Sequence, residues 1–403
     1  MIFRSADTTV AKVQIKIISR FVVGILMGVV VGGCSGAGLE PIQMEDKPLS
    51  SPLPINTRPK VLAIGSGFSV GIKKDGTVWT WGSNYKGILA RPISKPEEGY
   101  EPGQVPGLKD AVSVSASGSV LVLTQDGAVW SWGGNNHNHL DYELNEKKLR
   151  VPSAPSTPRK VLGLPKVIDI VSAGEMSVAL AENGVIWAWG GGGKNTLFNI
   201  DGGVKDYRPP TPIKGLPLIK KISSSAGVIA AIDTDGQLWT VGIKSESGRK
   251  PSKTEDPSTL IGRVVLPGKV ADVDLGAFLS AIALLENGQV WTWGWNSSGQ
   301  LGQGHSHSTY SPERINTLNR VRHVSGSMEY MAAITDEGDV LYWGSLIYGP
   351  SPEPLASTKL NVDSPIKIKS GVRAYELVTG SAAVAYLDDQ GRAWDCQTNC
   401  VTS

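Results

Sequence analysis

Near its N-terminus the sequence lacks an apolar run long enough to cross a membrane as a helix. The run there covers residues 21–31, which is eleven residues, whereas a membrane-spanning helix needs about 20. Cysteine is also scarce, with three residues in the whole chain, at positions 34, 396 and 400. No histidine lies near Cys396 and Cys400 in the sequence, which disfavours a thiolate metal site.

Clustered positive charge is missing as well. The chain has 39 Lys and Arg against 37 Asp and Glu, a net charge of +2, and the charges are interspersed. One stretch rich in Lys and Arg, residues 244–253, is offset by Glu246 and Glu255. Duplex DNA binding needs clustered cations that neutralise phosphates, so we expect no nucleic-acid partner.

No catalytic motif stands out. Neither G-x-S-x-G nor H-E-x-x-H occurs, and the glycine run 190–193 is not followed by the G-K-[ST] of a phosphate loop. The five histidines include two loop pairs, at positions 137 and 139 and at 305 and 307. Because these pairs belong to distant repeats, solvated loop histidines are favoured over a metal site. We expect no catalytic residue, no metal and no cofactor.

What the sequence does contain is one hairpin signature that returns seven times. Its turn glycines follow one another at spacings of 50 to 57 residues. A fixed period of this size is typical of stacked supersecondary units. The seven segments are DGTVWTWG at 75–82, DGAVWSWG at 126–133, NGVIWAWG at 183–190, DGQLWTVG at 235–242, NGQVWTWG at 287–294, EGDVLYWG at 337–344 and QGRAWDCQ at 390–397.

Each repeat predicts four short strands. An apolar run precedes each turn and a β-branched, aromatic run follows it, which predicts a hairpin, because Asp-Gly and Asn-Gly accept the positive φ of tight turns. A third strand is expected further upstream, over 61–65, 167–171 and 321–325 in three of the repeats. A fourth, weaker strand is expected from proline-containing stretches such as 212–214. Four strands in each of seven units predict an all-β, seven-bladed β-propeller.

The tryptophans favour the same architecture. Eleven of the twelve fall inside the hairpin signature, and Trp295 lies outside it. Trp79 and Trp81 would point to one face of their strand and Val78 and Thr80 to the other. Both sets are apolar or semi-apolar, so we expect neighbouring blades to cover both faces of each sheet, and the tryptophans to be structural.

These repeats resemble the RCC1-repeat family (regulator of chromosome condensation). The resemblance rests on the D-G-x-V-W-x-W-G hairpins and on one complete trailing G-Q-L-G loop, at residues 295–302. It covers residues 59–403 and implies a seven-bladed propeller over that range. The chain stops just after its seventh hairpin, so we expect a strand near residues 51–55 to join the last blade and close the ring.

The N-terminus predicts export and a lipid anchor. Residues 1–20 carry four basic side chains, the apolar run 21–31 follows, and small residues lead to Cys34. This pattern describes a signal peptide over 1–33, and Gly-Gly-Cys resembles a bacterial lipobox with lipid attached to Cys34. An ordinary signal peptide is the alternative. Ser35 favours an outer-membrane lipoprotein, and residues 34–58 are interpreted as a tether with a possible closing strand.

The oxidising cell envelope makes a disulfide the default for the remaining thiols. Cys396 and Cys400 are separated by three residues near the C-terminus. Their spacing is not that of a C-x-x-C redox motif, so we expect a Cys396–Cys400 disulfide and no redox activity.

Long stretches between the hairpins carry aromatic residues suited to protein binding. Tyr and Trp held in rigid loops are typical anchors of protein interfaces. We therefore expect a monomeric protein-binding module, a scaffold or inhibitor with a protein partner in the cell envelope. The alternatives are an envelope enzyme acting on polysaccharide or peptidoglycan, with convergent Asp and Glu on one propeller face, and a structural subunit of an envelope assembly. The predicted partner-binding residues are Tyr85, Tyr142, Phe198, Trp295 and Tyr310.

Overall fold

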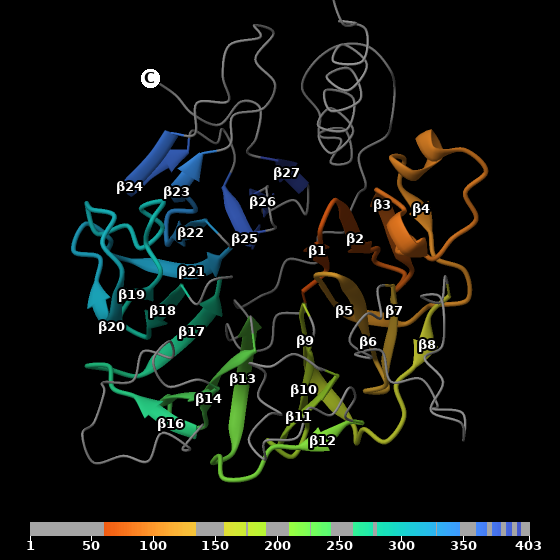
Figure 1. The fold of residues 1–403 in the computed structure, drawn as a ribbon, viewed down its shortest axis with the longest axis horizontal. Coiled ribbons are helices and arrows are strands. Elements are labelled where there is room, and N and C mark those ends of the chain that lie inside the picture. The colour runs from red at the N-terminus through yellow and green to blue at the C-terminus, as the bar shows by residue number, and fades with distance from the viewer. Residues whose placement is uncertain are drawn as a thin grey trace, which may run out of the picture.

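The structure is a ring of small antiparallel sheets arranged around a central axis (Figure 1). It is a computed structural model. Two short 3-10 helices, η2 (Tyr85–Gly87) and η3 (Pro96–Gly99), lie in the first repeat. No helix within the described ranges is long and apolar enough to span a bilayer. The structure describes residues 60–133, 157–174, 176–190, 209–225, 227–242, 261–276, 280–327, 329–346, 360–368, 373–379, 384–388 and 393–395.

The described residues form seven sheets, six of four strands and one of three. The first contains β1 (Leu62–Ile64), β2 (Phe68–Ile72), β3 (Val78–Gly82) and β4 (Gly103–Gln104). The second contains β5 (Ala111–Ala116), β6 (Ser119–Thr124), β7 (Val129–Gly133) and β8 (Arg159–Lys160). The third contains β9 (Val167–Ala173), β10 (Met176–Ala181), β11 (Ile186–Gly190) and β12 (Thr211–Pro212).

The other four sheets repeat this order. The fourth contains β13 (Ile219–Ser225), β14 (Val228–Asp233), β15 (Leu238–Val241) and β16 (Ile261–Val264). The fifth contains β17 (Val270–Leu275), β18 (Ala281–Leu285), β19 (Val290–Gly294) and β20 (Thr309–Arg314). The sixth contains β21 (Val321–Gly326), β22 (Tyr330–Thr335), β23 (Val340–Leu346) and β24 (Leu360–Ile368). The seventh contains β25 (Ala374–Thr379), β26 (Val384–Asp388) and β27 (Ala393–Asp395).

Each sheet is therefore one sequence repeat folded as a meander, as the sequence predicts. The hairpin signature supplies the turn between the second and third strands. The weak fourth strand is also present where expected, at the outer edge. In β20 and β24 its register shifts around Pro312 and Pro365, because proline has no N–H to donate to the neighbouring strand.

The hairpin turns differ in one detail from the tight two-residue turn that Asp-Gly favours. In the fifth sheet the Gly288 N–H donates to the Leu285 carbonyl at 2.9 Å, and the Leu285 N–H donates to the Gln289 carbonyl at 2.9 Å. Gly288 has φ +79°, and Asn287 is not among the described residues with positive φ. The turn thus needs one left-handed residue. The Asn287 side chain instead accepts the Gln289 N–H at 3.1 Å.

Tryptophans join neighbouring sheets within the part of the chain that the structure describes. The second tryptophan of the signature is buried in the described hairpins, and Trp132 and Trp343 are completely inaccessible. Trp132 packs among residues of the first sheet, and its Nε1 donates to the Ile88 carbonyl at 2.7 Å. Trp343 likewise packs on the fifth sheet and donates to the Gln300 carbonyl at 2.8 Å. The structural interpretation of these tryptophans is confirmed.

The first strands of the sheets surround the axis. Neighbouring first strands contact one another in the order β1, β5, β9, β13, β17, β21 and β25, and β25 also contacts β1. Leu62 and Trp81 of the first sheet pack with Val378 of β25. The predicted closing strand at residues 51–55 lies outside the described residues, so that its place in the ring stays a prediction.

Candidate functional site

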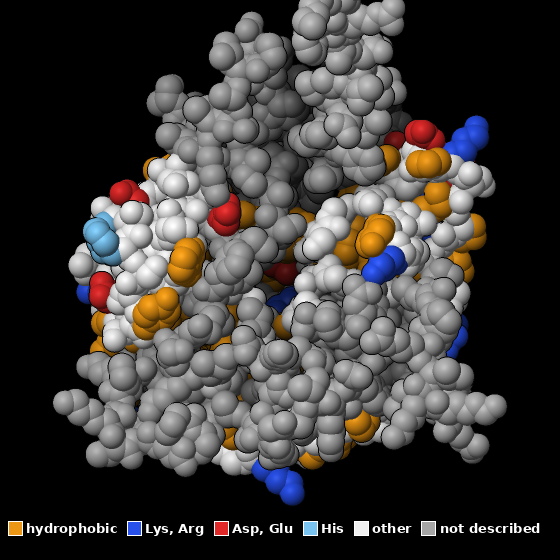
Figure 2. Space-filling model, in the orientation of Figure 1, with side chains coloured by type: hydrophobic (Ala, Val, Ile, Leu, Met, Phe, Trp, Pro, Cys, Tyr) orange, Lys and Arg blue, Asp and Glu red, His pale blue; other side chains and the backbone are white. Residues whose placement is uncertain are grey.

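A polar cavity lies on the axis of the ring. Its volume is about 210 Å³, and residues from the first strand of every sheet line it. Figure 2 shows a hollow near the middle of this face of the molecule, with acidic and basic side chains inside it. The charged and imidazole side chains that line the cavity are Lys60, Lys221, Asp272, Asp274, His323 and Glu376.

Strand register explains why these side chains meet. Each first strand from β5 to β25 has an irregularity near its start, where one residue is added relative to the second strand. The residue after each irregularity occupies the same register position in its sheet, so rotation about the axis brings these residues to one level. They are Ser113, Asp169, Lys221, Asp272, His323 and Glu376.

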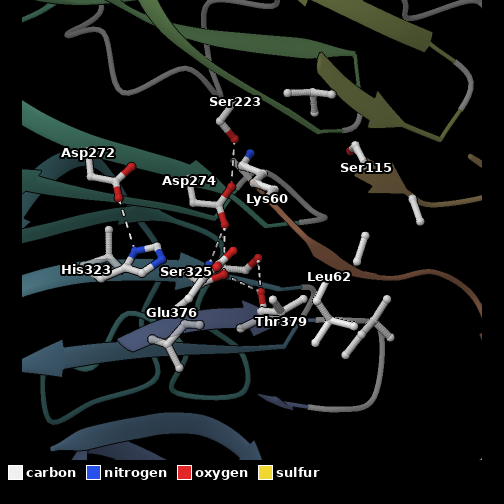
Figure 3. A pocket seen from close by; sticks show the side chains of 18 of the residues that line it. Lys60, Leu62, Ser115, Ser223, Asp272, Asp274, His323, Ser325, Glu376 and Thr379 are labelled. Carbon is white, nitrogen blue, oxygen red and sulfur yellow. Dashed lines mark hydrogen bonds and ion pairs between the residues drawn. The ribbon is translucent and has the colours of Figure 1, made fainter. Parts of the chain in front are cut away.

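Asp272 links three consecutive sheets at this level. Its Oδ1 lies 2.5 Å from the Lys221 ammonium of β13. Its Oδ2 lies 3.3 Å from Nδ1 of His323 in β21 (Figure 3). Burial alone would raise the pKa of the Asp272 carboxyl, but the charge of Lys221 and the proximity of His323 outweigh it and hold the pKa well below its usual range. Asp272 is therefore a fixed negative charge at neutral pH.

Asp274, two residues further along β17, is the centre of a hydrogen-bond network that includes several hydroxyl groups. Its Oδ1 accepts a hydrogen bond from Ser223 Oγ of β13 at 2.8 Å, and its Oδ2 accepts one from Ser325 Oγ of β21 at 3.2 Å. The Gly326 N–H also donates to Oδ2 at 2.9 Å. Ser325 Oγ in turn lies 2.8 Å from Thr379 Oγ1 of β25, which extends the network to the seventh sheet (Figure 3).

Lys60 lies two positions before the start of β1 and lines the cavity. Its carbonyl accepts the Val114 N–H of β5 at 2.8 Å, which fixes its backbone against the second sheet. Burial would lower the pKa of the Lys60 ammonium, but carboxylates led by Asp169 and Asp274 outweigh that effect and raise it. Lys60 therefore stays positively charged at neutral pH in a negative electrostatic environment.

Sequence reasoning missed this cavity. Apart from Lys60, each of these residues comes from a first strand with many apolar or small residues, such as Val270–Leu275 or Ile219–Ser225. The available signal was a polar residue at nearly the same distance before the turn glycine of successive hairpins. Asp272 lies sixteen positions before Gly288, and His323 lies fifteen before Gly338. That signal places them on equivalent strands, but only the ring brings them together.

Of the described aromatic candidates, Tyr85 and Trp295 lie on loops that follow third strands, and Tyr310 lies at the start of the fourth strand β20. Tyr85 is 74% exposed, Trp295 is 43% exposed and Tyr310 is 45% exposed. Trp295 and Tyr310 belong to one sheet, where Gly294 pairs with Thr309 across β19 and β20. Tyr85 belongs to the first sheet, on another part of the ring (Figure 1). We call the ring face that carries these loops the loop face; the hairpin turns lie on the opposite, turn face.

A hydrogen-bonded loop supports Trp295. The neighbouring Asn296 accepts the Leu301 N–H at 2.9 Å and donates to the carbonyls of His305 and His307, at 2.8 and 2.9 Å. Trp295 Nε1 donates to Ser297 Oγ at 2.7 Å. The first sheet repeats the arrangement, because Asn84 accepts the Leu89 N–H at 3.1 Å. The loop therefore holds Trp295 in place without burying it.

Other predicted sites are not placed. Tyr142, Phe198, Cys34, Cys396 and Cys400 lie outside the described residues. So do the histidines at positions 137 and 139, whereas the rings of His305 and His307 lie 5.4 Å apart in the fifth sheet's loop. Within the described ranges, no three His, Cys, Asp or Glu side chains gather as a metal ion would require.

Comparisons with known proteins agree with the repeat structure. The model of the Regulator of chromosome condensation (RCC1) repeat matches residues 75–123, 126–180 and 287–334. A second RCC1-repeat model matches residues 60–88 and 270–300. Among curated proteins, the chain is 27% identical over 333 residues to the mitochondrial RCC1 domain-containing protein RUG3 of Arabidopsis thaliana, covering 77% of this chain and 72% of that protein.

Further relatives are more distant. Protein pim1 of Schizosaccharomyces pombe is 24% identical over 352 residues, which is 77% of this chain but 64% of pim1. Human WBSCR16 superposes with a TM-score of 0.68 at 20% identity, covering 81% of this chain and 86% of the other. Yeast RCC1 (Prp20), solved with Kap60 bound to it, gives a TM-score of 0.66 at 20% identity, covering 80% and 78%. The family models thus detect RCC1 repeats in this chain, and the sheet order and the solved structures agree with a β-propeller fold of the RCC1 type.

Proposed function

We propose that this chain is an exported, lipid-anchored propeller that binds a protein of the cell envelope through its loop face. The single observation that carries the proposal is the exposure of Trp295 and Tyr310 on one sheet beside a hydrogen-bonded loop. Rigid, exposed aromatic side chains provide large contact area at little entropic cost, so they act as anchors in protein interfaces. An RCC1-type propeller solved with a protein partner, Kap60 on yeast RCC1, supports this use of the fold.

The export part of the proposal rests on the N-terminal sequence. The basic residues, the apolar run 21–31 and Cys34 fit a lipoprotein signal, and they favour an outer-membrane anchor. The partner would then be an envelope protein, and the sharper form of the proposal is an inhibitor that occludes an enzyme. The chain acts as a monomer on its tether, contacts the membrane through its lipid and binds no nucleic acid.

The axial cavity gives little support to the alternative of an envelope enzyme. Asp272 and Asp274 do converge there with Glu376, as that alternative requires. However, Asp272 is paired with Lys221 and its pKa is lowered, so it is a poor proton donor at neutral pH. Asp274 is held by two serine hydroxyls and a backbone N–H. This arrangement provides fixed charge and structure, so protein binding remains the better-supported function.

The experiment is partner capture in the native envelope. The anchored protein is crosslinked, purified and analysed by mass spectrometry, as wild type and as a Trp295→Ala, Tyr310→Ala double variant. We expect one protein to be enriched by the wild type and at least tenfold less by the double variant, because losing interface anchors costs about 2 kcal/mol or more. Leu218→Ala is the matched control, since Leu218 is 59% exposed but lies on the turn face.

The outcomes separate the proposals. Equal capture by the wild type and the double variant would show that Trp295 and Tyr310 are not the anchors. Retention on cell-wall glycans without a protein partner would favour the enzyme alternative, whereas copurification at fixed stoichiometry would indicate a structural subunit. Incorporation of labelled palmitate that disappears in Cys34→Ala tests the lipid anchor separately.

A further inference from the structure

The axial cavity contains more negative than positive charge. Three carboxylates among its lining residues, Asp272, Asp274 and Glu376, accompany two ammonium groups, Lys60 and Lys221. Asp169 adds a fourth carboxylate, because its charge acts on Lys60 from the third sheet. These four carboxylates outnumber the two ammonium groups by two. Charges in a hollow with low-dielectric walls interact more strongly than charges in bulk water, so the excess favours entry of a cation.

Hydrogen-bond acceptors are available in the same place. Asp272 is buried, and its Oδ2 accepts no hydrogen bond of good geometry from the described residues, although His323 Nδ1 lies 3.3 Å away. Ser115 and Ser223 line the cavity from β5 and β13. Ser115 Oγ accepts the Ser172 N–H at 2.9 Å, and Ser223 Oγ donates to Asp274 and accepts the Leu275 N–H at 3.2 Å. Each of these hydroxyl oxygens has a second lone pair that a donor could use. The Asp272 Oδ2 atom is closed to solvent, so a cation in the cavity would act on the Asp272 carboxylate through its charge.

Lys60 shows which kind of cation the cavity accommodates. It supplies a primary ammonium on a four-carbon chain, and this group lines the cavity with the carboxylates (Figure 3). No ion pair within 4.0 Å joins Lys60 to a carboxylate of the described residues. The lysine therefore acts through space and leaves a cavity of about 210 Å³ open beside it. A cavity of about 150 Å³ is enough for benzene, so a ligand of six or seven non-hydrogen atoms fits.

We propose that the axial cavity is a binding site for a small aliphatic primary amine in its ammonium form, with Lys60 as the competing internal cation. An ammonium group donates three hydrogen bonds, which suits the hydroxyl and carboxylate groups that line the cavity. A short diamine suits the site best, since its two charges match the excess of two carboxylates. Divalent metal ions suit it less, because no described group of three metal-ligating side chains is present.

Titration of the full-length protein with 1,4-diaminobutane, followed by calorimetry, tests the proposal. We expect saturable binding with one site per chain, weaker binding of n-butylamine, and no binding of 1,4-butanediol, which lacks charge. Tetramethylammonium, which lacks N–H donors, should also fail. Stronger binding of Ca²⁺ than of the diamine would replace the amine site by a metal site and overturn the proposal.

Matched variants locate the site. Glu376→Gln should weaken diamine binding at least roughly tenfold, and Lys60→Met should strengthen it by a similar factor, because each changes one charge inside a low-dielectric cavity. Glu182→Gln and Lys166→Met are the controls, since that exposed ion pair, 2.6 Å apart, lies by the hairpin turns. Binding that responds equally to the control variants, or absence of saturable heat in both wild type and Lys60→Met, would overturn the proposal. If Lys60→Met does not fold, the wild-type and Glu376→Gln titrations decide alone.

Discussion

At the scale of single residues, the repeats are governed by the difference between aspartate or asparagine and glycine in the hairpin turn. The polar residue bends the chain with its side chain, whereas the glycine alone takes the left-handed conformation. The glycine is also confined in space by the next sheet. A Cβ added to Gly288 would lie 3.1 Å from the Cα of Arg320, which belongs to the start of the sixth repeat. The turn is thus a contact between sheets as well as a reversal of the chain.

Gly288→Ala should lower the free energy of unfolding by about 1–2 kcal/mol, because φ +79° is strained for any residue with a Cβ. The measurement is urea unfolding followed by circular dichroism. Gly268→Ala is the control, since its added Cβ would make only an ordinary contact at 3.5 Å with Leu285. Equal stability of the two variants would contradict the assigned role of the left-handed turn residue.

Asp272 makes stability depend on acidity. Its pKa is lower in the folded protein than in the unfolded chain, so its contribution is fully present above about pH 4 and is lost as the pH falls further. Asp272→Asn should therefore be less stable than wild type at pH 7, by roughly 3 kcal/mol, since it leaves Lys221 without its buried partner.

Unfolding by urea at pH 7 and pH 3 checks this prediction. The difference between wild type and Asp272→Asn should shrink at pH 3, where the wild-type carboxylate begins to lose its advantage. Asp336→Asn, which alters an exposed ion pair 3.5 Å from Arg320, should change the pH dependence little. A constant gap between wild type and Asp272→Asn at the two pH values would be inconsistent with the depressed pKa.

At the scale of elements, the third strand of each sheet is the one that joins neighbouring sheets. The second tryptophan of the described hairpins is buried, and in the second and sixth sheets, as Trp132 and Trp343, it donates to the loop of the preceding sheet. The loop is in turn organised by one asparagine, Asn84 or Asn296, that accepts a backbone N–H five residues ahead. Strand and loop of successive repeats are therefore mutually dependent.

Trp132→Ala should cost about 3–5 kcal/mol of stability, because a fully buried indole leaves a large cavity between the first and second sheets. Trp132→Phe should cost less and separate the two contributions. It keeps most of the apolar contact but leaves the buried Ile88 carbonyl without its donor, a loss of about 1–3 kcal/mol. Chemical unfolding of both variants provides the values, with half-buried Trp130→Ala as the comparison. A larger effect of Trp130→Ala than of Trp132→Ala would refute this assignment.

At the scale of the whole molecule, the sequence repeats allowed the sheets to be predicted well. They did not allow prediction of the axial cavity, which depends on how the sheets are arranged around the ring. Hairpins, four-stranded units and buried tryptophans follow from local patterns such as residues 75–82, because turn chemistry and alternation act over a few residues. Asp272 and His323 are 51 residues apart in sequence. Their meeting depends on register and on rotation about the axis, neither of which a single repeat contains. Trp295 could be singled out because it breaks the repeat pattern.

Ring integrity provides a prediction at this scale. Deletion of residues 48–58 should lower the melting temperature sharply, because the seventh sheet, with three described strands, would lose the strand expected from this segment. Differential scanning calorimetry of the deletion variant measures the change. An unchanged melting curve would rule out a closing strand in this segment, and a control deletion within residues 36–44 of the tether should leave the curve unaltered.

The hydrogen bond from Trp343 to Gln300 has an optical consequence. Gln300 belongs to the loop that begins at Trp295, whereas Trp343 belongs to the next sheet and is shielded from water. Indole emission is sensitive to a change in its hydrogen bond, so movement of this loop would alter the fluorescence of a residue that is itself buried. With Trp295 replaced by phenylalanine to remove direct quenching, the protein would carry its own spectroscopic label for events on the loop face.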